Sequence, residues 1–178
     1  MRNQFAEYVS GAPDLLAFYE APPSELFAKA PVARDWDPSL VSAMRAYQER
    51  IGSTGTIPGN EAVIITGQQP AVFTGPLYCI YKAATTIRLA EKLSALHGVP
   101  VAPVYWIGSE DHDFDEARTA HFLTKSHQSH SFRYAPDGPV DGLPMYRVPL
   151  NASIHEAIDD IAAETPGSEF REDVQSFL

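Results

Sequence analysis

The fold is decided by the stretch AVIITGQQPAVFTGPLYCIYKAATTIRLAEKLSALHGVPVAPVYWI, residues 62–107. It opens with the apolar, β-branched segment 62–66 and closes with a second apolar segment at 99–107. Short segments of this kind are typical of strands that are buried on both faces of a parallel sheet. Between them, apolar residues recur at helical spacing over residues 77–96, and Gly98 is well suited to end that helix.

The order strand, loop, helix, strand predicts a βαβ unit with parallel strands, and hence an α/β fold. In open parallel sheets, ligands bind beyond the carboxyl ends of the strands. Two unusual loops occupy that edge here, at residues 67–75 and 108–116. Because both loops follow neighbouring strands, we expect them to line one pocket.

The rest of the chain predicts an arm before this unit and further elements after it. Residues 1–60 form an aromatic and proline-rich arm, in which Asp37-Pro38 begins a helix. Residues 61–178 form the first half of the core. Within them we expect a weak strand at 117–123, a hairpin or two edge strands at 129–134 and 145–149, and a helix with a capping box at Ser153 and Glu156. A last helical pattern, after Ser168, has no stop signal before Leu178, which suggests a fragment of a longer chain.

Composition excludes several classes of protein. The 178 residues are 44% hydrophobic, which is enough for a buried core. Thirteen basic and 23 acidic residues give a net charge of −10, so binding to duplex nucleic acid is disfavoured. No apolar run has the length of a membrane span or of a signal peptide, and we expect a cytoplasmic protein. A single cysteine, Cys79, excludes an internal disulfide and is interpreted as a small buried hydrophobe.

The first loop is a candidate anion site. It offers Gly67, Gln68, Gln69, Thr74 and Gly75 just before a helix, whose N-terminal amides and dipole favour phosphate. The loop has neither the Walker A pattern nor the G-x-G-x-x-G spacing, so a plain strand-to-helix turn remains the alternative. Lys82 belongs to the same candidate set, although its place two turns into the helix puts it far from a phosphate at the loop.

The second loop holds the densest titratable cluster of the chain. Candidate catalytic residues are Glu110, Asp111, His112 and Asp113, and Asp115 and Glu116 follow directly. A histidine between carboxylates can act as an acid–base group or donate to a phosphate. The carboxylates could also hold Mg²⁺ or Mn²⁺, or could simply cap backbone amides of a hydrated loop. Tyr105 and Trp106, at the end of the preceding strand, are expected in the core.

Two blocks of sequence resemble the bacillithiol biosynthesis cysteine-adding enzymes, the BshC family. One is TGQQPAVFTGPLYCIYK at residues 66–82, and the other is PVYWIGSEDHDFDE at residues 103–116. They are similar to the family patterns TGQQ-x-G-x-FTGPLY-x-x-YK and PVFW-x-x-x-EDHDF-x-E. The chain departs from these patterns at Ala71, where the family has glycine, and at Cys79, where threonine is common.

The resemblance implies a Rossmann-like core similar to that of class I aminoacyl-tRNA synthetases and nucleotidyltransferases. It also implies a ligase that completes bacillithiol by joining cysteine to glucosaminyl-malate through an amide bond. Such a reaction needs an activated carboxyl, as an adenylate or acyl phosphate, so the implied cofactor is a nucleotide such as ATP or ADP. The resemblance also implies a longer protein that forms homodimers through a C-terminal coiled coil, which we expect to lie beyond residue 178.

Two other functions stay open from the sequence. A metal-dependent nucleotidyltransferase or phosphoesterase would use the acid cluster to bind Mg²⁺. A nucleotide-binding module without catalysis would use only the first loop. Tightly bound divalent metal would favour the former, and nucleotide binding without binding of cysteine or glucosaminyl-malate would favour the latter.

Overall fold

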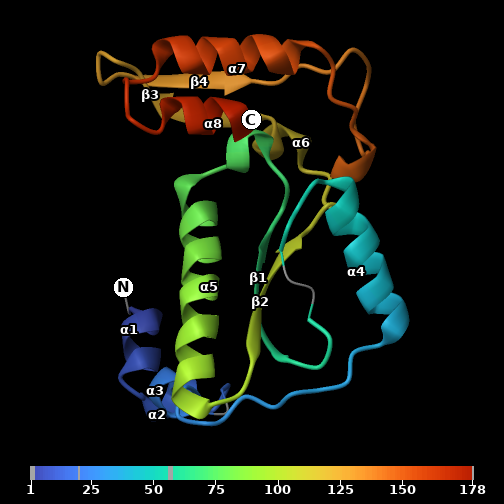
Figure 1. The fold of residues 1–178 in the computed structure, drawn as a ribbon. Helices are drawn as coiled ribbons and strands as arrows, with labels where there is room; N and C mark the ends of the chain where they lie inside the picture. The colour runs from blue at the N-terminus through green and yellow to red at the C-terminus, as the bar shows by residue number, and fades with distance from the viewer. Residues whose placement is uncertain (1–2, 20, 56–57, 178) are drawn as a thin grey trace. The chain divides into compact units, whose positions relative to one another are not determined.

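The computed structural model describes residues 3–19, 21–55 and 58–177. Its central feature is the expected βαβ unit, made of strand β1 (Ala62–Gln68), helix α5 (Leu77–His97) and strand β2 (Val101–Ile107). The two strands form a two-stranded parallel sheet, and Figure 1 traces this order along the chain. The βαβ unit and the α/β fold predicted from the sequence are therefore confirmed.

Contacts at both ends of the strands agree with the parallel direction. Ala62 and Val101, which begin the two strands, belong to one buried cluster together with Ala90 and Leu93 of α5. At the other end, the amide of Gly108 donates to the carbonyl oxygen of Gln68 at 2.9 Å. The two loops that follow the strands therefore begin beside each other.

The chain divides into two compact units, and the boundaries between them fall within β1, α5 and β2. The first consists of Met1–Ile65 and Thr86–Val104, and the second of Thr66–Thr85 and Tyr105–Leu178. All candidate site residues belong to the second unit. The predicted boundary at residue 60, between an arm and a core, stays a prediction.

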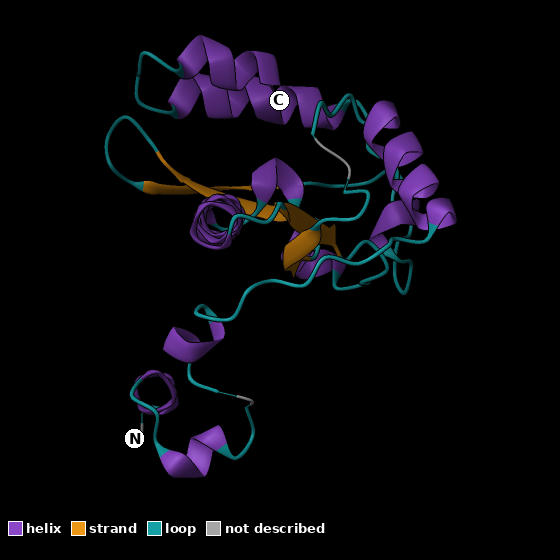
Figure 2. Cartoon of the chain, turned by 60° about the horizontal axis from the view of Figure 1, so that its bottom comes forward, coloured by secondary structure: helices purple, strands orange, loops and turns teal. Residues whose placement is uncertain are grey.

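The first unit holds the N-terminal helices and the start of the βαβ unit. The short helices α1 (Gln4–Val9), α2 (Pro13–Leu16) and α3 (Pro23–Leu26) precede α4 (Pro38–Arg50). Figure 2 shows the loops that join them. The α4 start is as predicted, because the Asp37 carboxylate accepts from the Ser39 amide at 2.7 Å and Pro38 follows it. No helix in the described part of the chain has both the length and the hydropathy to cross a membrane.

The second unit holds the site loops and a hairpin. It contains the 3₁₀ helix η1 (Val72–Thr74), α6 (Phe114–Ala117), the antiparallel strands β3 (Thr119–Leu123) and β4 (Ser129–Arg133), the 3₁₀ helix η2 (Met145–Arg147), α7 (Ser153–Glu164) and α8 (Arg171–Phe177). The register pairs Thr119 with Arg133 and Leu123 with Ser129.

Three sequence-based expectations are wrong in this unit. Residues 145–149 are not a strand, since the amides of Met145 and Tyr146 bond to loop carbonyls of Asp111 and Ser109 instead of to a strand. Strand β4 (Ser129–Arg133) therefore forms its hairpin with β3 (Thr119–Leu123), which precedes it in the chain.

The expected capping box of α7 does not form either. Ser153 is already helical, the N-cap is Ala152, and the amide and hydroxyl of Ser153 both donate to the side-chain oxygen of Asn151. At the end of β2, Tyr105 and Trp106 were expected in the core, yet they are 38% and 60% exposed. Cys79, by contrast, is buried as predicted.

Candidate functional site

The first site loop begins where the backbones of β1 and β2 come unusually close. A Cβ atom built on Gly67 would lie 2.7 Å from the carbonyl oxygen of Trp106 and 3.0 Å from its Cβ. Real Cβ atoms do not approach backbone atoms so closely, so this position requires glycine for packing. The loop therefore leaves the sheet from a fixed point.

Its far end has a backbone that few residues adopt. Phe73 and Thr74 have φ values of 52° and 69°, and Gly75 combines φ 69° with ψ −156°, a region populated almost only by glycine. The ring of Phe73 packs against Phe132 of β4 with centroids 5.6 Å apart, which supports this conformation. Strained backbone at a helix start is common in ligand-binding loops.

The family glycine that the sequence lacks at position 71 is not required here. Ala71 has extended backbone, with φ −147° and ψ 155°, which any residue can adopt. Its methyl group instead fills the space beside Gly75, since a Cβ on Gly75 would lie 3.0 Å from the Ala71 Cβ.

Lys82 reaches back to the loop from α5. Its ammonium donates to the carbonyl oxygen of Gly67 and, at 3.1 Å, to Oε1 of Gln68. The sequence placed Lys82 far from a phosphate at the loop, and the structure shows that the residue binds the loop itself. Gln68 in turn donates from its amide nitrogen to Oε1 of Gln69 at 3.2 Å. The two glutamines and the lysine thus form one chain of hydrogen bonds.

A hollow of about 450 Å³ lies between this loop, α5 and the end of β2. Its lining includes three of the predicted ligand-binding residues, Gln68, Gln69 and Thr74. Cys79 and Tyr105 also line it. Burial, and to a lesser degree the neighbouring Cys79, raises the pKa of the Tyr105 phenol above its ordinary value, so this hydroxyl remains a hydrogen-bond donor. Tyr105, predicted in the core from its apolar strand, is therefore a lining residue that the sequence pattern did not indicate.

The second loop is held by bonds within itself and to η2. The amide of Asp113 donates to the Asp111 carboxylate at 2.8 Å, and the Asp113 carboxylate caps α6 by accepting from the Glu116 amide at 3.2 Å. A ring nitrogen of His112 lies 3.3 Å from the carbonyl oxygen of Glu110. The carbonyl oxygen of Asp111 accepts from the Met145 amide at 2.8 Å. Two of the carboxylates thus help to shape the loop, as the capping alternative expected.

Most of the candidate catalytic side chains of the second loop are exposed to solvent. Glu110, His112 and Asp113 are exposed, and Asp111 is half-buried. None of the four lines the hollow beside the first loop. The structure therefore joins the two loops through their backbones, at Gly108 and Gln68, without gathering all the predicted residues around that hollow.

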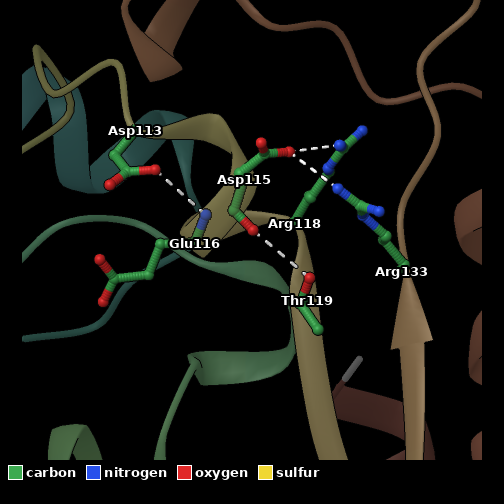
Figure 3. A network of polar contacts seen from close by, with 6 residues as sticks. All are labelled: Asp113, Asp115, Glu116, Arg118, Thr119 and Arg133. Carbon is green, nitrogen blue, oxygen red and sulfur yellow. Dashed lines mark hydrogen bonds and ion pairs between the residues drawn. The ribbon is translucent and has the colours of Figure 1, made fainter.

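An ion-pair network joins the end of the acid cluster to two arginines that are not among the candidate residues (Figure 3). Oδ1 of Asp115 accepts hydrogen bonds from two guanidinium groups, that of Arg133 at 2.9 Å and that of Arg118. The hydrogen bond from Arg133, which has the largest effect, and the one from Arg118 together hold the pKa of the Asp115 carboxyl below its ordinary range. The i,i+3 spacing of Asp115 and Arg118 was a readable signal, whereas Arg133 reaches Asp115 only because β4 pairs with β3.

Among the described residues, no group of three or more histidine, cysteine, aspartate or glutamate side chains is arranged to hold a metal ion. The acid cluster faces basic partners and backbone amides instead. The arrangement places exposed carboxylates of the second loop next to the start of the first loop.

Comparisons with known proteins give the family. A family model described as "Bacillithiol biosynthesis BshC, N-terminal Rossmann-like domain" matches residues 2–178. Relatives named "Putative cysteine ligase BshC" include one from Symbiobacterium thermophilum, 35% identical over 79% of this chain and 26% of the relative. Those from Heliobacterium modesticaldum and Salinibacter ruber are 44% and 40% identical over 43% and 61% of this chain, and over 17% and 20% of their own lengths. The chain thus spans about a quarter or less of these relatives, and it belongs to the BshC family, of which it carries the N-terminal Rossmann-like domain.

Proposed function

We propose that this chain supplies the N-terminal part of a ligase of bacillithiol biosynthesis, which joins cysteine to glucosaminyl-malate through an amide bond. The observation that carries the proposal is the match to the BshC N-terminal domain over residues 2–178. The relatives' printed name, cysteine ligase, agrees with it. The domain division at residue 60 and the cytoplasmic location predicted from the sequence belong to the same proposal, as does a homodimer formed through a coiled coil outside this chain.

The first loop serves the activation of a carboxyl group. An amine does not displace hydroxide from a carboxylate, so the carboxyl of cysteine must first become an acyl phosphate or an adenylate. The first turn of an α-helix leaves backbone amides without partners inside the helix, next to the positive end of the helix dipole. In α5 the amide of Cys79 donates to the carbonyl oxygen of Pro76 at 2.8 Å, which leaves the amides of Leu77 and Tyr78 for a ligand in our proposal. These amides and the side chains of Gln69 and Thr74 would bind phosphate oxygens of an activating nucleotide such as ATP. Gly67 and Gly75 would give the loop its shape, since the Gly75 amide already donates to the carbonyl oxygen of Val72 at 3.1 Å.

Lys82 fixes that loop from behind. Its bonds to the Gly67 carbonyl and the Gln68 side chain tie α5 to the end of β1. A lysine that holds a loop carbonyl stabilises the loop conformation and leaves a positive charge close to the phosphate position.

The second loop serves the amines. Both substrates carry an amino group, and exposed carboxylates attract ammonium ions. In our proposal Glu110 and Asp111 bind the cysteine ammonium. The amino group of glucosaminyl-malate attacks the activated carbonyl, the new C–N bond forms, and the bond from the carbonyl carbon to the phosphate oxygen breaks. His112, assisted by Asp113, takes the proton that the amine loses.

A test in cells addresses the reaction class. Cells without the gene should accumulate glucosaminyl-malate and contain no bacillithiol, as measured by thiol profiling with mass spectrometry. Return of the unchanged gene should restore bacillithiol. Normal bacillithiol in the deletion strain, confirmed to lack any second copy, would contradict the proposal.

A pair of variants addresses the loop. Gly75→Ala adds a methyl group in a glycine-only conformation, 3.0 Å from Ala71. Gly98→Ala imposes a similar positive φ, 66°, but meets nothing within 4 Å. The first should lower nucleotide affinity by about tenfold or more, at 1.4 kcal/mol for each factor of ten, and the second should leave it unchanged. Equal affinities in both variants would remove this loop from the nucleotide site.

A further inference from the structure

A second hollow lies beside the first site loop, and no step of the proposed reaction uses it. It has a volume of about 240 Å³. Its walls come from the loop after β1, from α6, from the residue after β4, and from the segment around η2. Its lining is mostly apolar or aromatic and includes Val72, Phe114, Ala117, Tyr134, Met145 and Val148.

Arg118 is the only charged residue among the described residues that line this hollow. Its Nε is buried and has no hydrogen-bond partner within the described structure. Its Cζ lies 5.1 Å from the centre of the Phe114 ring, so the guanidinium stacks on an apolar wall. A buried donor without an acceptor is unfavourable, and a ligand that supplies an acceptor removes that penalty.

The charge of Arg118 is only partly neutralised. Asp115 is its ion-pair partner, but the same carboxylate oxygen also accepts from Arg133. One negative charge is thus shared by two positive charges, and Figure 3 shows both guanidinium groups turned toward Asp115 while the Glu116 carboxylate points away from them. The network therefore retains a positive charge beside an apolar hollow.

We propose that this hollow binds a small, mainly apolar carboxylate, whose apolar body lies among the six apolar side chains and whose carboxylate accepts from the Arg118 guanidinium. An apolar cavity of about 150 Å³ holds benzene, so this hollow suits a molecule somewhat larger than benzene. The positive guanidinium selects an anion over a neutral molecule of the same shape.

The site is separate from the proposed nucleotide loop but shares a wall with it. Pro70 and Ala71 line both hollows. The inference concerns binding alone and holds whether or not the proposed ligase reaction is correct.

The test measures binding of 4-methylpentanoate and of its neutral isostere, 4-methylpentanamide, near pH 7. The reporter is the ¹³C-labelled methyl group of Met145, which lies in the lining and is assigned by its absence from a Met145→Leu variant. The unchanged protein, at its natural length, should bind the carboxylate at least about tenfold more tightly than the amide, at 1.4 kcal/mol for each factor of ten.

Two arginine variants separate a ligand contact from a general charge effect. Arg118→Met keeps an apolar stem and leaves Asp115 paired with Arg133, and it should abolish the preference for the carboxylate. Arg133→Met leaves Asp115 paired with Arg118 alone and changes no lining residue of the hollow. It removes the surplus positive charge but keeps the Arg118 contact, so the preference should fall less than in Arg118→Met and should persist. Val148→Phe should fill the hollow and remove binding of both probes.

Several results would overturn the proposal. These are an unshifted Met145 methyl signal with both probes, equal binding of carboxylate and amide, or an unchanged preference in Arg118→Met. Correct folding of each variant is read from the dispersion of the remaining methyl signals. If Val148→Phe does not fold, the comparison of Arg118→Met with Arg133→Met still tests the proposal.

Discussion

Gly67 and Trp106 bring the two parallel strands closer together than a residue with a Cβ atom at position 67 would permit. A methyl group on Gly67 would lie 2.7 Å from the Trp106 carbonyl oxygen, which belongs to the backbone and cannot turn away. Next to this contact, the amide of Gly108 bonds to the carbonyl of Gln68. The positions of both site loops thus depend on one close approach.

Gly67→Ala should therefore destabilise the fold. The added methyl group must push the strands apart, and overpacking of this kind costs about 1–3 kcal/mol. Gly138→Ala is the matched control, because a Cβ at Gly138 meets nothing within 4 Å and its backbone needs no positive φ. Urea unfolding, followed by circular dichroism, measures both changes. Equal stability of the two variants would show that the strands separate at little cost.

The Asp115 ion pairs predict a dependence of stability on pH. Arg133 and then Arg118 lower the pKa of the Asp115 carboxyl, so the folded state holds its proton less tightly than the unfolded state does. The stabilisation is fully present above the unfolded pKa of about 3.9 and is lost as the pH falls through the lower folded pKa. Because Asp115 is exposed, the effect should be small.

Asp115→Asn isolates this contribution. The difference in free energy of unfolding between the unchanged protein and Asp115→Asn should be constant above about pH 5 and should shrink below about pH 4. Asp160→Asn, at an exposed position of α7, controls for the loss of one negative charge. A difference that does not change between pH 7 and about pH 3 would contradict the assignment of these ion pairs.

Local patterns were enough to predict the elements that position the site. The β-branched segment from Ala62, the helical spacing up to His97 and the Asp37-Pro38 start all describe interactions within a few residues of each other. Strand β2 begins at Val101, two residues later than expected. Because β1 and β2 are linked by a single crossover helix, their parallel pairing also followed from the sequence.

Features that depend on distant residues could not be read in this way. The composition of the segment at Met145 is typical of a strand. Its backbone amides nevertheless donate to the carbonyl oxygens of Ser109 and Asp111 in the second loop. Arg133 meets Asp115 only through the register of the hairpin. Lys82 lies more than one turn into α5, and its long side chain extends back far enough for the ammonium to reach the carbonyl oxygen of Gly67. The candidate catalytic roles of Glu110, Asp111, His112 and Asp113 stay predictions.

Lys82→Met should weaken nucleotide binding by about tenfold while the fold persists, since the variant keeps the apolar stem and loses the bonds to Gly67 and Gln68. Lys92→Met, at an exposed position of the same helix, is the control. Isothermal titration of each variant with ATP measures the affinity. Lys82→Arg should recover part of it, because a guanidinium can also donate to both oxygens. An unchanged affinity in Lys82→Met would show that the loop holds its conformation without the lysine.

His112→Ala tests the proposed proton acceptor. If the imidazole acts mainly in the transition state, the variant should lower kcat by about 100-fold and change KM for glucosaminyl-malate little. His121→Ala removes an exposed histidine of β3 and should leave kcat unchanged. Bacillithiol formation by the protein at its natural length, with its fold confirmed by circular dichroism, measures both. A kcat close to normal in His112→Ala would exclude the histidine as the base and leave Asp111 and Asp113 as the candidates in this loop. A raised KM with unchanged kcat would instead assign His112 to substrate binding, because such a change removes interactions that are equal in the ground state and the transition state.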